Sequence, residues 1–530
     1  MKHNKHLLGL LLIVLIGLAA CSQAPINKKK LQKPLTLNIS AEPSVLNPIL
    51  STDSASSKVI DLVFSGLLRV STNLELIPDL AQSYTINSEG TIYTFNLHKN
   101  AYWHDGKPVT AEDVKFTFER ILDPKTNTVR RSNYIINGKE VQFKVINSHC
   151  IQAILPQPFA PFLTHMTMGI LPKHLLSNQD INTALFNRNP IGSGPFVFQE
   201  WHSAQFIRLK RNENYYGKRP KLGSLLLKII PDQNTALISL EKAEIDQSGI
   251  SGKDYARYKD HPEFSIHRYE DLVYTYMGFN LKHQFFKDSQ IRKAIAMAIN
   301  KDAIVNGVLK GFGTTAHLPA SPVSWAFPET LKKNPYPYNP EKSRQLLKAA
   351  GFRKNKQGIL QKNGQPFEFT LITNKGNKDR EKVAQLIQQF LKSVDIKVEI
   401  RLMEWSSFIK IVNAAKDPKD FDAVILGWSL GLDPDGHSLW HSSQYPKGFN
   451  FVAYNNAKVD KALQKGRLTM NTQHRKTIYK QVYHEIAKDL PYIFLYYPES
   501  LTGIQDRVKG LSPAGPAGLM NPIENVYLQP

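Results

Sequence analysis

Cysteine is nearly absent from this chain of 530 residues, which contains only Cys21 and Cys150. Cys21 belongs to a leader-like N-terminal segment, so we expect no internal disulfide in the mature protein. Cys150 follows His149, and such a pair can indicate a nucleophile. Cys150 lies between the strand-like runs VQFKV and IQAIL, however, where a lone cysteine is typically a small buried hydrophobe. We therefore predict a structural role for Cys150.

Long hydrophobic runs and familiar catalytic signatures are also missing. The apolar run over residues 7–20 has about fourteen residues, fewer than the roughly 20 that a membrane-spanning helix needs. No second run approaches that length, so we expect the body of the protein to lie outside the membrane. The spacings GxSxG, HExxH, GxxxxGKS/T and paired CxxC do not occur either. These absences argue against the common hydrolase, phosphate-loop and zinc-site classes.

Acidic residues are outnumbered, with 45 Asp and Glu against 67 Lys and Arg and a net charge of +22. The basic residues are scattered among acids and aromatics, and no dense basic block occurs outside residues 22–34. This distribution argues against a nucleic-acid partner. A charge of this sign favours an anionic membrane surface or acidic ligands.

The N-terminus has the pattern of an export signal. Lys2 and Lys5 precede the apolar run, which leads to LAAC ending at Cys21. This ending resembles the lipobox of bacterial lipoproteins, in which the cysteine becomes the lipidated first residue. We expect residues 1–20 to be a signal peptide and residues 21–34 a polar tether. The body would then be lipid-anchored in the cell envelope, facing the periplasm or the exterior.

Strand-like and helix-like patterns alternate along the body without an internal repeat. SYTIN and TIYTFNLH flank SEG, which predicts a hairpin. Thr110, followed by Asp113, predicts a capped helix over residues 111–122. We also predict helices over residues 56–68 and 340–350. The alternation predicts α/β lobes with mixed sheets.

The segment ILGWSLGLDPDGHSLWHSS, residues 425–443, contains two acids, two histidines and two tryptophans. The residues of DPDG are those that favour a turn, and this is the first interpretation of the segment. A calcium loop would require an acid at its twelfth position, where the chain has Gln444. Two interpretations stay open here: a transition-metal or hydrolytic centre, or the wall of a pocket. The residues concerned are Asp433, Asp435, His437 and His441 for the centre, and Trp428 and Trp440 for the wall.

Several segments occur in the order and spacing of one family, including EPSVLNPIL, PDLAQSYTINSEGTIYTFNLHKNAYWHDGKPVTAEDVKFTFERILDP, NPIGSGPFVFQEW and FDAVILGWSLGLDPDG. Together they resemble the dipeptide- and oligopeptide-binding lipoproteins that serve ABC importers, family 5 of the extracellular solute-binding proteins. The resemblance covers nearly the whole body, from about residue 36 to about residue 525.

The resemblance implies the two-lobed periplasmic-binding-protein fold, an α/β fold with mixed sheets, a hinge between the lobes and an extra α/β domain inserted in lobe one. Closure about the hinge would bury the ligand. Lobe two would span residues 267–491 and the extra domain residues 75–185. Lobe one would consist of residues 35–74, 186–266 and 492–530.

The resemblance also implies where a ligand binds. Trp428 and Trp405 match aromatic residues that line the family's cleft. Peptide binders of the family carry an Asp three residues after the first tryptophan, to pair with the peptide's ammonium group, but this chain has Gly431 there. Asp433 is the nearest acid. The ligand-binding candidates are Trp405, Trp428, Ser429, Gly431 and Asp433.

A second departure concerns the opposite end of the ligand. The oligopeptide binder has an Arg three residues before the cleft tryptophan, and this chain has Ile425. An unpaired buried ammonium group costs several kcal/mol. Either Asp433 replaces the missing acid, or the usual ligand has no free amino end.

The implied function is capture of peptides and their delivery to the permease subunits of an ABC importer, by a monomer without catalytic residues, metal or cofactor. Peptidoglycan-derived or amino-blocked peptides are an alternative ligand class. Nickel and haem binders share the fold, as do sugar binders, so the fold alone does not identify the ligand. An enzyme using His437 and His441 is the alternative from another class.

Overall fold

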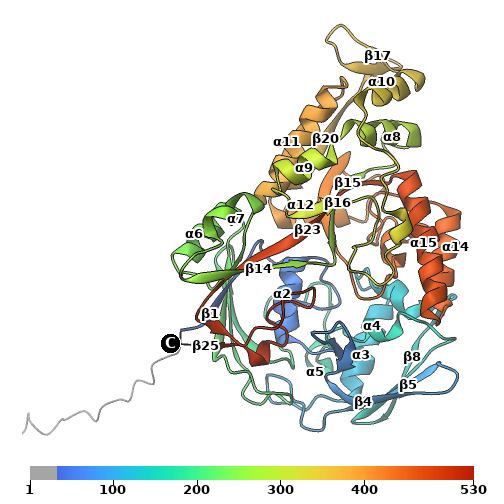
Figure 1. The fold of residues 1–530 in the computed structure, drawn as a ribbon. Coiled ribbons are helices and arrows are strands. Elements are labelled where there is room, and N and C mark those ends of the chain that lie inside the picture. The colour runs from blue at the N-terminus through green and yellow to red at the C-terminus, as the bar shows by residue number, and fades with distance from the viewer. Residues whose placement is uncertain (1–32, 530) are drawn as a thin grey trace, which may run out of the picture. The chain divides into compact units, whose positions relative to one another are not determined.

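A computed structural model describes residues 33–529 (Figure 1). Within this range no helix combines the length and the apolar character needed to cross a membrane. The expected signal segment and Cys21 lie outside the described residues. The body is a mixed α/β structure, as predicted.

One long strand, β23 (Tyr492–Gln505), belongs to both lobes. Its partners are β13 (Gln247–Gly249) and β14 (Phe264–Glu270) in lobe one, and β15 (Val273–Phe279) and β16 (Gly313–Thr315) in lobe two. Pro498 pairs with Gly313, and Glu499 pairs with Glu270. Along β23 the pairing partners therefore change from those of lobe two to those of lobe one at Pro498–Glu499.

Strand order in both lobes follows from this crossing. In lobe one the order is β10 (Phe196–His202), β11 (Phe206–Arg211), β12 (Ser224–Ile229), β1 (Leu35–Ile39), β13 and β23. In lobe two it is β23, β15, β22 (Ala423–Ser429), β20 (Glu368–Asn374) and β21 (Lys397–Met403). β1 lies parallel to β12, and β20 lies parallel to β21 and β22. The pairs β10–β11, β11–β12, β13–β23, β15–β23 and β15–β22 are antiparallel. Mixed sheets are thereby confirmed.

Helices cover both faces of the lobe-two sheet. One apolar core packs the sheet against α8 (Ser289–Ala298), α10 (Pro340–Ala349) and α11 (Lys378–Lys392). The core on the other face contains residues of α12 (Trp405–Asn413), α14 (Ala457–Leu468) and α15 (Thr472–Asp489). Asn339 caps α10 through its side chain, and proline occupies the first turn of that helix, as its sequence predicts.

The inserted segment has its own four-stranded sheet, in the order β4 (Ala81–Ile86), β5 (Ile92–Leu97), β9 (Cys150–Ile154), β8 (Gln142–Asn147). β4 and β5 form the predicted hairpin. α3 (Ala111–Leu122) begins with the predicted capping box of Thr110 and Asp113. Side chains of this segment share one continuous apolar core with lobe one. That shared core favours movement of the segment together with lobe one.

Two local predictions need correction. The helix expected over residues 56–68 is α2 (Ser54–Val63), and Phe64 is already extended. Gly66 lies so close to the Thr167 backbone that a Cβ would be 2.5 Å from the Thr167 carbonyl oxygen. The chain after Phe64 therefore packs against the Thr167 backbone and does not continue the helix. Cys150 lies in a strand, as predicted, but it is half-buried rather than buried.

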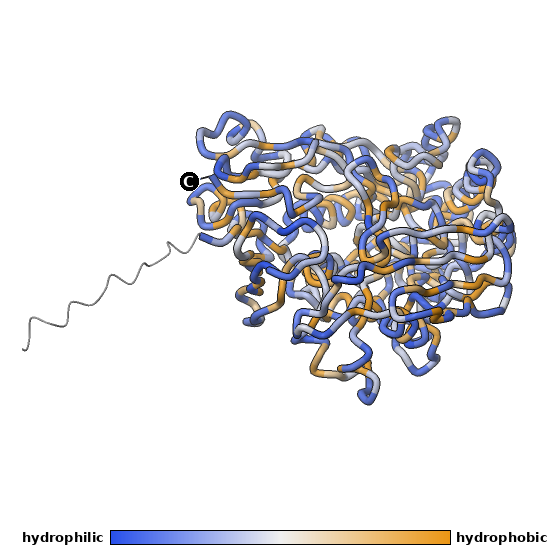
Figure 2. Tube along the Cα trace, turned by 90° about the horizontal axis from the view of Figure 1, so that it is seen from below, coloured by the Kyte–Doolittle hydropathy of each residue, from blue (hydrophilic) through white to orange (hydrophobic). Residues whose placement is uncertain are grey.

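Hydrophobic stretches of the chain lie largely in the interior, whereas many outer loops are hydrophilic (Figure 2). The two cores of lobe two meet across β22, whose Ile425 faces one core and whose Leu426 faces the other. β22 therefore emerges from a rigid, buried sheet. The segment that follows it carries most of the candidate site residues.

Candidate functional site

The 425–443 segment consists of the end of β22, a loop, and the short helix α13 (His437–Trp440). Trp428 pairs across the sheet with Tyr274 of β15. Because strand side chains alternate, Trp428 shares the face of Leu426. This register presents the Trp428 indole on the face covered by α12 and α15.

Trp428 is half-buried in a group of aromatic rings. Its ring centroid lies 5.8 Å from that of Phe451, in a stacked arrangement, and 5.3 Å from that of Phe449, edge-on. The indole N–H donates to the Tyr492 hydroxyl at 3.5 Å, a long hydrogen bond. An indole held in this way has part of its surface left for a ligand.

Trp405 lies where the two lobes touch. It starts α12 in lobe two, and its indole N–H donates to Asp53 of lobe one at 3.4 Å. Asn413, at the other end of α12, donates to Thr52 at 3.0 Å. The Asp53 carboxylate also caps α2. We call this contact between α12 and the start of α2 the lobe seam.

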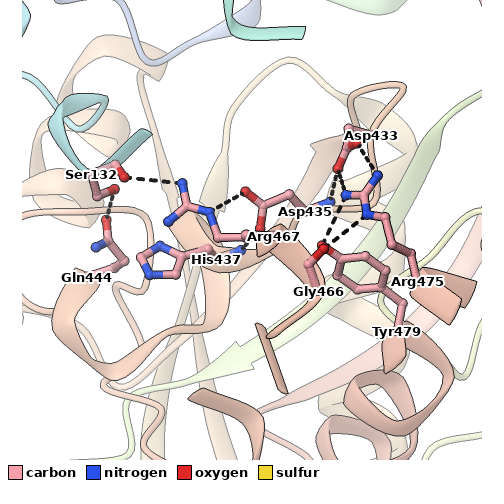
Figure 3. A network of polar contacts seen from close by, with 9 residues as sticks. All are labelled: Ser132, Asp433, Asp435, His437, Gln444, Gly466, Arg467, Arg475 and Tyr479. Carbon is pink, nitrogen blue, oxygen red and sulfur yellow. Dashed lines mark hydrogen bonds and ion pairs between the residues drawn. The ribbon is translucent and has the colours of Figure 1, made fainter. Parts of the chain in front are cut away.

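The carboxylate of Asp433 is already paired. Arg475 of α15 donates to its two oxygens at 2.6 and 2.7 Å, and the Arg475 residue is only 5% exposed (Figure 3). Burial raises the pKa of Asp433, while the Arg475 guanidinium opposes that rise. An ion pair with two hydrogen bonds leaves this carboxylate no free charge for an ammonium group. A ligand-binding role for Asp433 therefore competes with Arg475.

Asp435 has a similar structural role in the loop. Its carboxylate lies 3.0 Å from Nε of Arg467, a residue of α14, and it accepts the backbone N–H of His437 at 3.1 Å (Figure 3). Asp433 in turn accepts the backbone N–H of Asp435 at 2.9 Å. These bonds are those of an acid-rich turn. Two arginines from two helices thus hold the DPDG loop.

The two histidines of the segment stack on each other, with ring centroids 4.3 Å apart. His441 Nδ1 bonds the Ser443 hydroxyl at 2.8 Å, and its Nε2 lies 3.1 Å from the Gln464 amide. Burial, followed by the charge of Arg467, lowers the pKa of His437 to about 2. Among residues 33–529 no group of three or more His, Cys, Asp or Glu is placed to hold a metal ion.

The remaining sequence candidates have different surroundings. Ser429 and Gly431 are exposed, and a Cβ on Gly431 would meet only the Asp433 carbonyl oxygen at 4.0 Å. An aspartate would therefore fit at position 431. Ile425 is fully buried in the core beside α11. A side chain at position 425 points into this core rather than toward a ligand.

One residue that the sequence analysis missed is Arg380, in the first turn of α11. Gly427 leaves room for the Arg380 guanidinium, because a Cβ at position 427 would lie 2.8 Å from Nη2 of Arg380. Arg380 donates to the Asn374 side chain at 3.0 Å, and burial lowers its pKa. Across residues 33–529 no carboxylate lies within ion-pair distance of it.

Arg380 also lies beside a second contact between the lobes. Its neighbour Asp379 accepts the Ser251 hydroxyl of lobe one at 2.7 Å, and Lys378 pairs with Asp232 at 2.9 Å. A half-buried guanidinium beside Gly427 and close to both lobes is suited to a carboxylate. In the sequence, KDREKV resembles any exposed helix start, so only tertiary packing distinguishes Arg380.

Two cavities, of about 380 and 610 Å³, lie elsewhere on lobe two. The first is lined by residues around Lys419 and Asp422, at the start of β22, and the second lies between α11 and β21. Neither contains a ligand-binding residue predicted from the sequence. The seam and the end of β22 remain the candidate site.

Comparison with known proteins identifies the family. The description "Bacterial extracellular solute-binding proteins, family 5 Middle" matches residues 75–451. The oligopeptide-binding protein AppA of Bacillus subtilis is 35% identical, over 96% of each chain. The solved structure of B. subtilis AppA with a nonapeptide superposes with a TM-score of 0.90 at 34% identity, covering 94% of this chain and 99% of that one.

A metal-complex binder is also similar. NikZ of Campylobacter jejuni, solved with Ni(L-His), has a TM-score of 0.84 at 32% identity and covers 93% of this chain and 99% of its own. The family description matches most of the chain, and AppA aligns with nearly all of it. The chain therefore belongs to family 5 of the bacterial extracellular solute-binding proteins.

Proposed function

We propose that this protein captures peptides between its two lobes and delivers them to the permease subunits of an ABC importer. Membership of the family makes it a solute-binding protein outside the cytoplasm and not an enzyme. The peptide assignment is supported by AppA, whose solved complex contains a nonapeptide. An extended peptide can bind through its main chain, which requires no side-chain selectivity.

The pairing of Asp433 with Arg475 carries the more specific proposal. Since Gly431 has no side chain and Asp433 is neutralised, no acid of this loop is free to hold a ligand's ammonium group. Arg380, by contrast, has no carboxylate partner among the described residues. The site therefore holds the carboxylate end of the peptide through Arg380 and leaves the amino end without an ionic clamp.

This asymmetry suits peptides whose amino end is already an amide, as in peptides joined to a sugar acid. It also permits ordinary peptides with weaker binding. Trp428 and Trp405 supply the apolar walls in either case. Peptidoglycan-derived peptides thus remain a ligand class compatible with the site.

The similarity to NikZ raises nickel complexes as a second candidate. His437 and His441 would be the residues to bind the metal, but both ring nitrogens of His441 already have partners. A nickel role would require those partners to be displaced. A binding assay with nickel and free histidine, run beside one with peptides, separates the two candidates.

Lipid attachment at Cys21, a monomeric state and the division of the chain into two lobes with an inserted segment belong to the same proposal. Lipidation would hold the protein at a membrane while the lobes close about two chain crossings. One crossing is Pro498–Glu499 within β23, and the other is the link between β14 and β15, from Glu270 to Val273. Cys21→Ala should yield protein without acyl mass or an unprocessed precursor. Intact mass of membrane-extracted wild type without an acyl addition would contradict the anchor.

The test of the function is retention of a peptide library. The purified protein should retain peptides stoichiometrically, and mass spectrometry of the released ligands should find them intact. Cleaved peptides would indicate turnover and overturn the binding-only function. Retention of nickel–histidine with no peptide would support the second candidate instead.

A further inference from the structure

α14 and α15 form an antiparallel hairpin of helices on lobe two (Figure 1). Residues 469–471 connect the two helices. At one end of the hairpin Asn456, which caps α14, donates to the carboxylate of Asp489 at 2.7 Å. At the other end Arg475 donates to the Gly466 carbonyl at 3.1 Å (Figure 3). The helices therefore lie side by side along most of their length.

Six lysines follow the outer face of this hairpin. Their spacing is three and four residues in α14 and four and eight residues in α15, which places them on one face of each helix. The opposite faces of both helices are buried in the core of lobe two. All six side chains belong to exposed residues: Lys458, Lys461, Lys465, Lys476, Lys480 and Lys488. We call this set the lysine face.

The other charged residues of the hairpin are turned toward the protein. Asp460 accepts the backbone N–H and the hydroxyl of Ser442, at 2.9 and 2.6 Å. Arg467 and Arg475 are buried and paired with the two acids of the DPDG loop. Within α14 and α15, which are both fully described, no exposed residue is acidic. The hairpin therefore presents only basic charges on its outer side.

The lysine face has no counter-charge within the protein. None of its six lysines forms an ion pair with any residue of the described range 33–529. On other helices the pattern differs, since Lys115 of α3 lies 3.7 Å from Glu119 and Lys378 of α11 lies 2.9 Å from Asp232. Like charges four residues apart on a helix repel each other. An external anionic surface would relieve that repulsion.

The chemistry of this face indicates what kind of anion it fits. Lysine carries a point charge on a flexible stem, whereas arginine suits bidentate binding of one defined anion. Within α14 and α15 no arginine, tyrosine or tryptophan is exposed, and no residue of the hairpin lines either of the two cavities of lobe two. Met470, in the turn between the helices, is 51% exposed. Flexible cations beside an exposed apolar side chain suit a diffuse anionic interface.

We propose that the lysine face contacts the anionic headgroup surface of a membrane. A protein that delivers its ligand to a permease must approach a bilayer, and this delivery is the only part of the proposed function on which the inference rests. Each lysine close to such a surface contributes about fivefold to partitioning. Contact through α14 and α15 holds lobe two at the bilayer, with Met470 at the interface. Acylation of Cys21 is not required.

The test measures partitioning of the full chain onto lipid vesicles by co-sedimentation. Every protein carries Cys21→Ala, so that no acyl chain contributes. This parent protein should bind vesicles of equal parts phosphatidylcholine and phosphatidylglycerol at least about tenfold more tightly than vesicles of phosphatidylcholine alone. High salt should remove the difference, because it screens exposed charges.

A variant and a control with the same net charge locate the contact. The variant combines Lys461→Gln, Lys465→Gln, Lys476→Gln and Lys480→Gln. It should lose at least about tenfold in partitioning onto the anionic vesicles. The control replaces four exposed lysines of lobe two outside the hairpin: Lys342→Gln, Lys348→Gln, Lys356→Gln and Lys382→Gln. It should stay within about threefold of the parent.

Equal losses in variant and control overturn the inference, because vesicle binding would then follow net charge alone. A parent protein without preference for anionic vesicles also overturns it, and that comparison needs no variant. Polyglutamate serves as the probe for an acidic protein surface: its binding through the four lysines, without a preference for anionic vesicles, contradicts the membrane assignment. Peptide retention, measured on the same proteins, should be equal in parent and variant. Its loss in the parent would count against the proposed function and not against the lysine face.

Discussion

Arg475 donates to both carboxylate oxygens of Asp433, at 2.6 and 2.7 Å, inside the loop that follows the cleft strand. The loop acid therefore stabilises the protein, and its charge is not available to the ligand. Relatives that place an acid nearer the tryptophan would have that acid at position 431, where this chain has glycine.

Asp433→Asn should destabilise the fold, because it leaves the buried guanidinium of Arg475 without its counter-charge. The free energy of unfolding should fall by about 3 kcal/mol, the scale of breaking a buried pair. The ratio of affinities for a free and an N-acetylated peptide should not change. Chemical denaturation and calorimetry measure the two quantities.

The matched control for that variant is Asp433→Leu combined with Arg475→Met, which removes both charges and should recover much of the stability. A selective loss of affinity for free-amine peptides in Asp433→Asn, at unchanged stability, would show that Asp433 is an anchor after all.

Trp428→Ala should weaken peptide binding by more than about 1 kcal/mol, the contribution of a well-packed aromatic contact. The indole holds its place through Phe449, Phe451 and Tyr492, so its exposed part is presented rigidly. Trp405→Ala should have a similar effect and also loosen the seam to Asp53. Trp201, on the outer strand β10, is the control for tryptophan loss. Unchanged affinity in both variants would place the ligand elsewhere.

Much of the fold could be predicted because its signals are local. The capping box at Thr110, the hairpin around SEG and the Asn339–Pro340 helix start each depend on a few adjacent residues. The site could be predicted only in part. Trp428 could be predicted because the segment around it resembles the family. The partner of Asp433 lies 42 residues away on α15, and no local pattern indicates that pairing.

Arg380 was missed for the same reason. Burial of Arg380 depends on the missing side chain of Gly427, a neighbour only in the folded sheet. The α2 helix ended early because Gly66 packs on the Thr167 backbone, also far along the chain. Tertiary contacts decided each of these cases.

Arg380→Gln should lower affinity for peptides with a free carboxylate by at least about tenfold, and hardly affect the same peptides as C-terminal amides. The reason is that Arg380 has no carboxylate partner within the described residues, so a ligand can supply it. Lys382→Gln, exposed on the same helix, is the control for charge alone. Equal losses for acid and amide forms would mean that Arg380 only supports the packing of α11.

Acid should destabilise the protein through His437. Its pKa is lowered to about 2 in the folded state, whereas an unfolded histidine titrates near 6.5. Below about pH 6.5 the unfolded chain therefore binds a proton that the folded chain does not, and stability falls by about 1.4 kcal/mol per pH unit. His437→Gln should make the decline between pH 6.5 and pH 4 shallower. His474→Gln, at an exposed position of α15, should keep the wild-type decline. A decline that is unaltered in His437→Gln would contradict a neutral buried ring.

The most direct test is calorimetry of one tripeptide, free and N-acetylated, against wild type and Gly431→Asp. Position 431 has room for the added side chain, since a Cβ there meets nothing nearer than 4.0 Å. Wild type should bind both forms within about threefold, because no acid clamps the amino end. Gly431→Asp should favour the free form by about tenfold, near 1.4 kcal/mol, by supplying the missing counter-charge. Wild-type binding of the free form that is ten or more times tighter than that of the acetylated form would contradict the account.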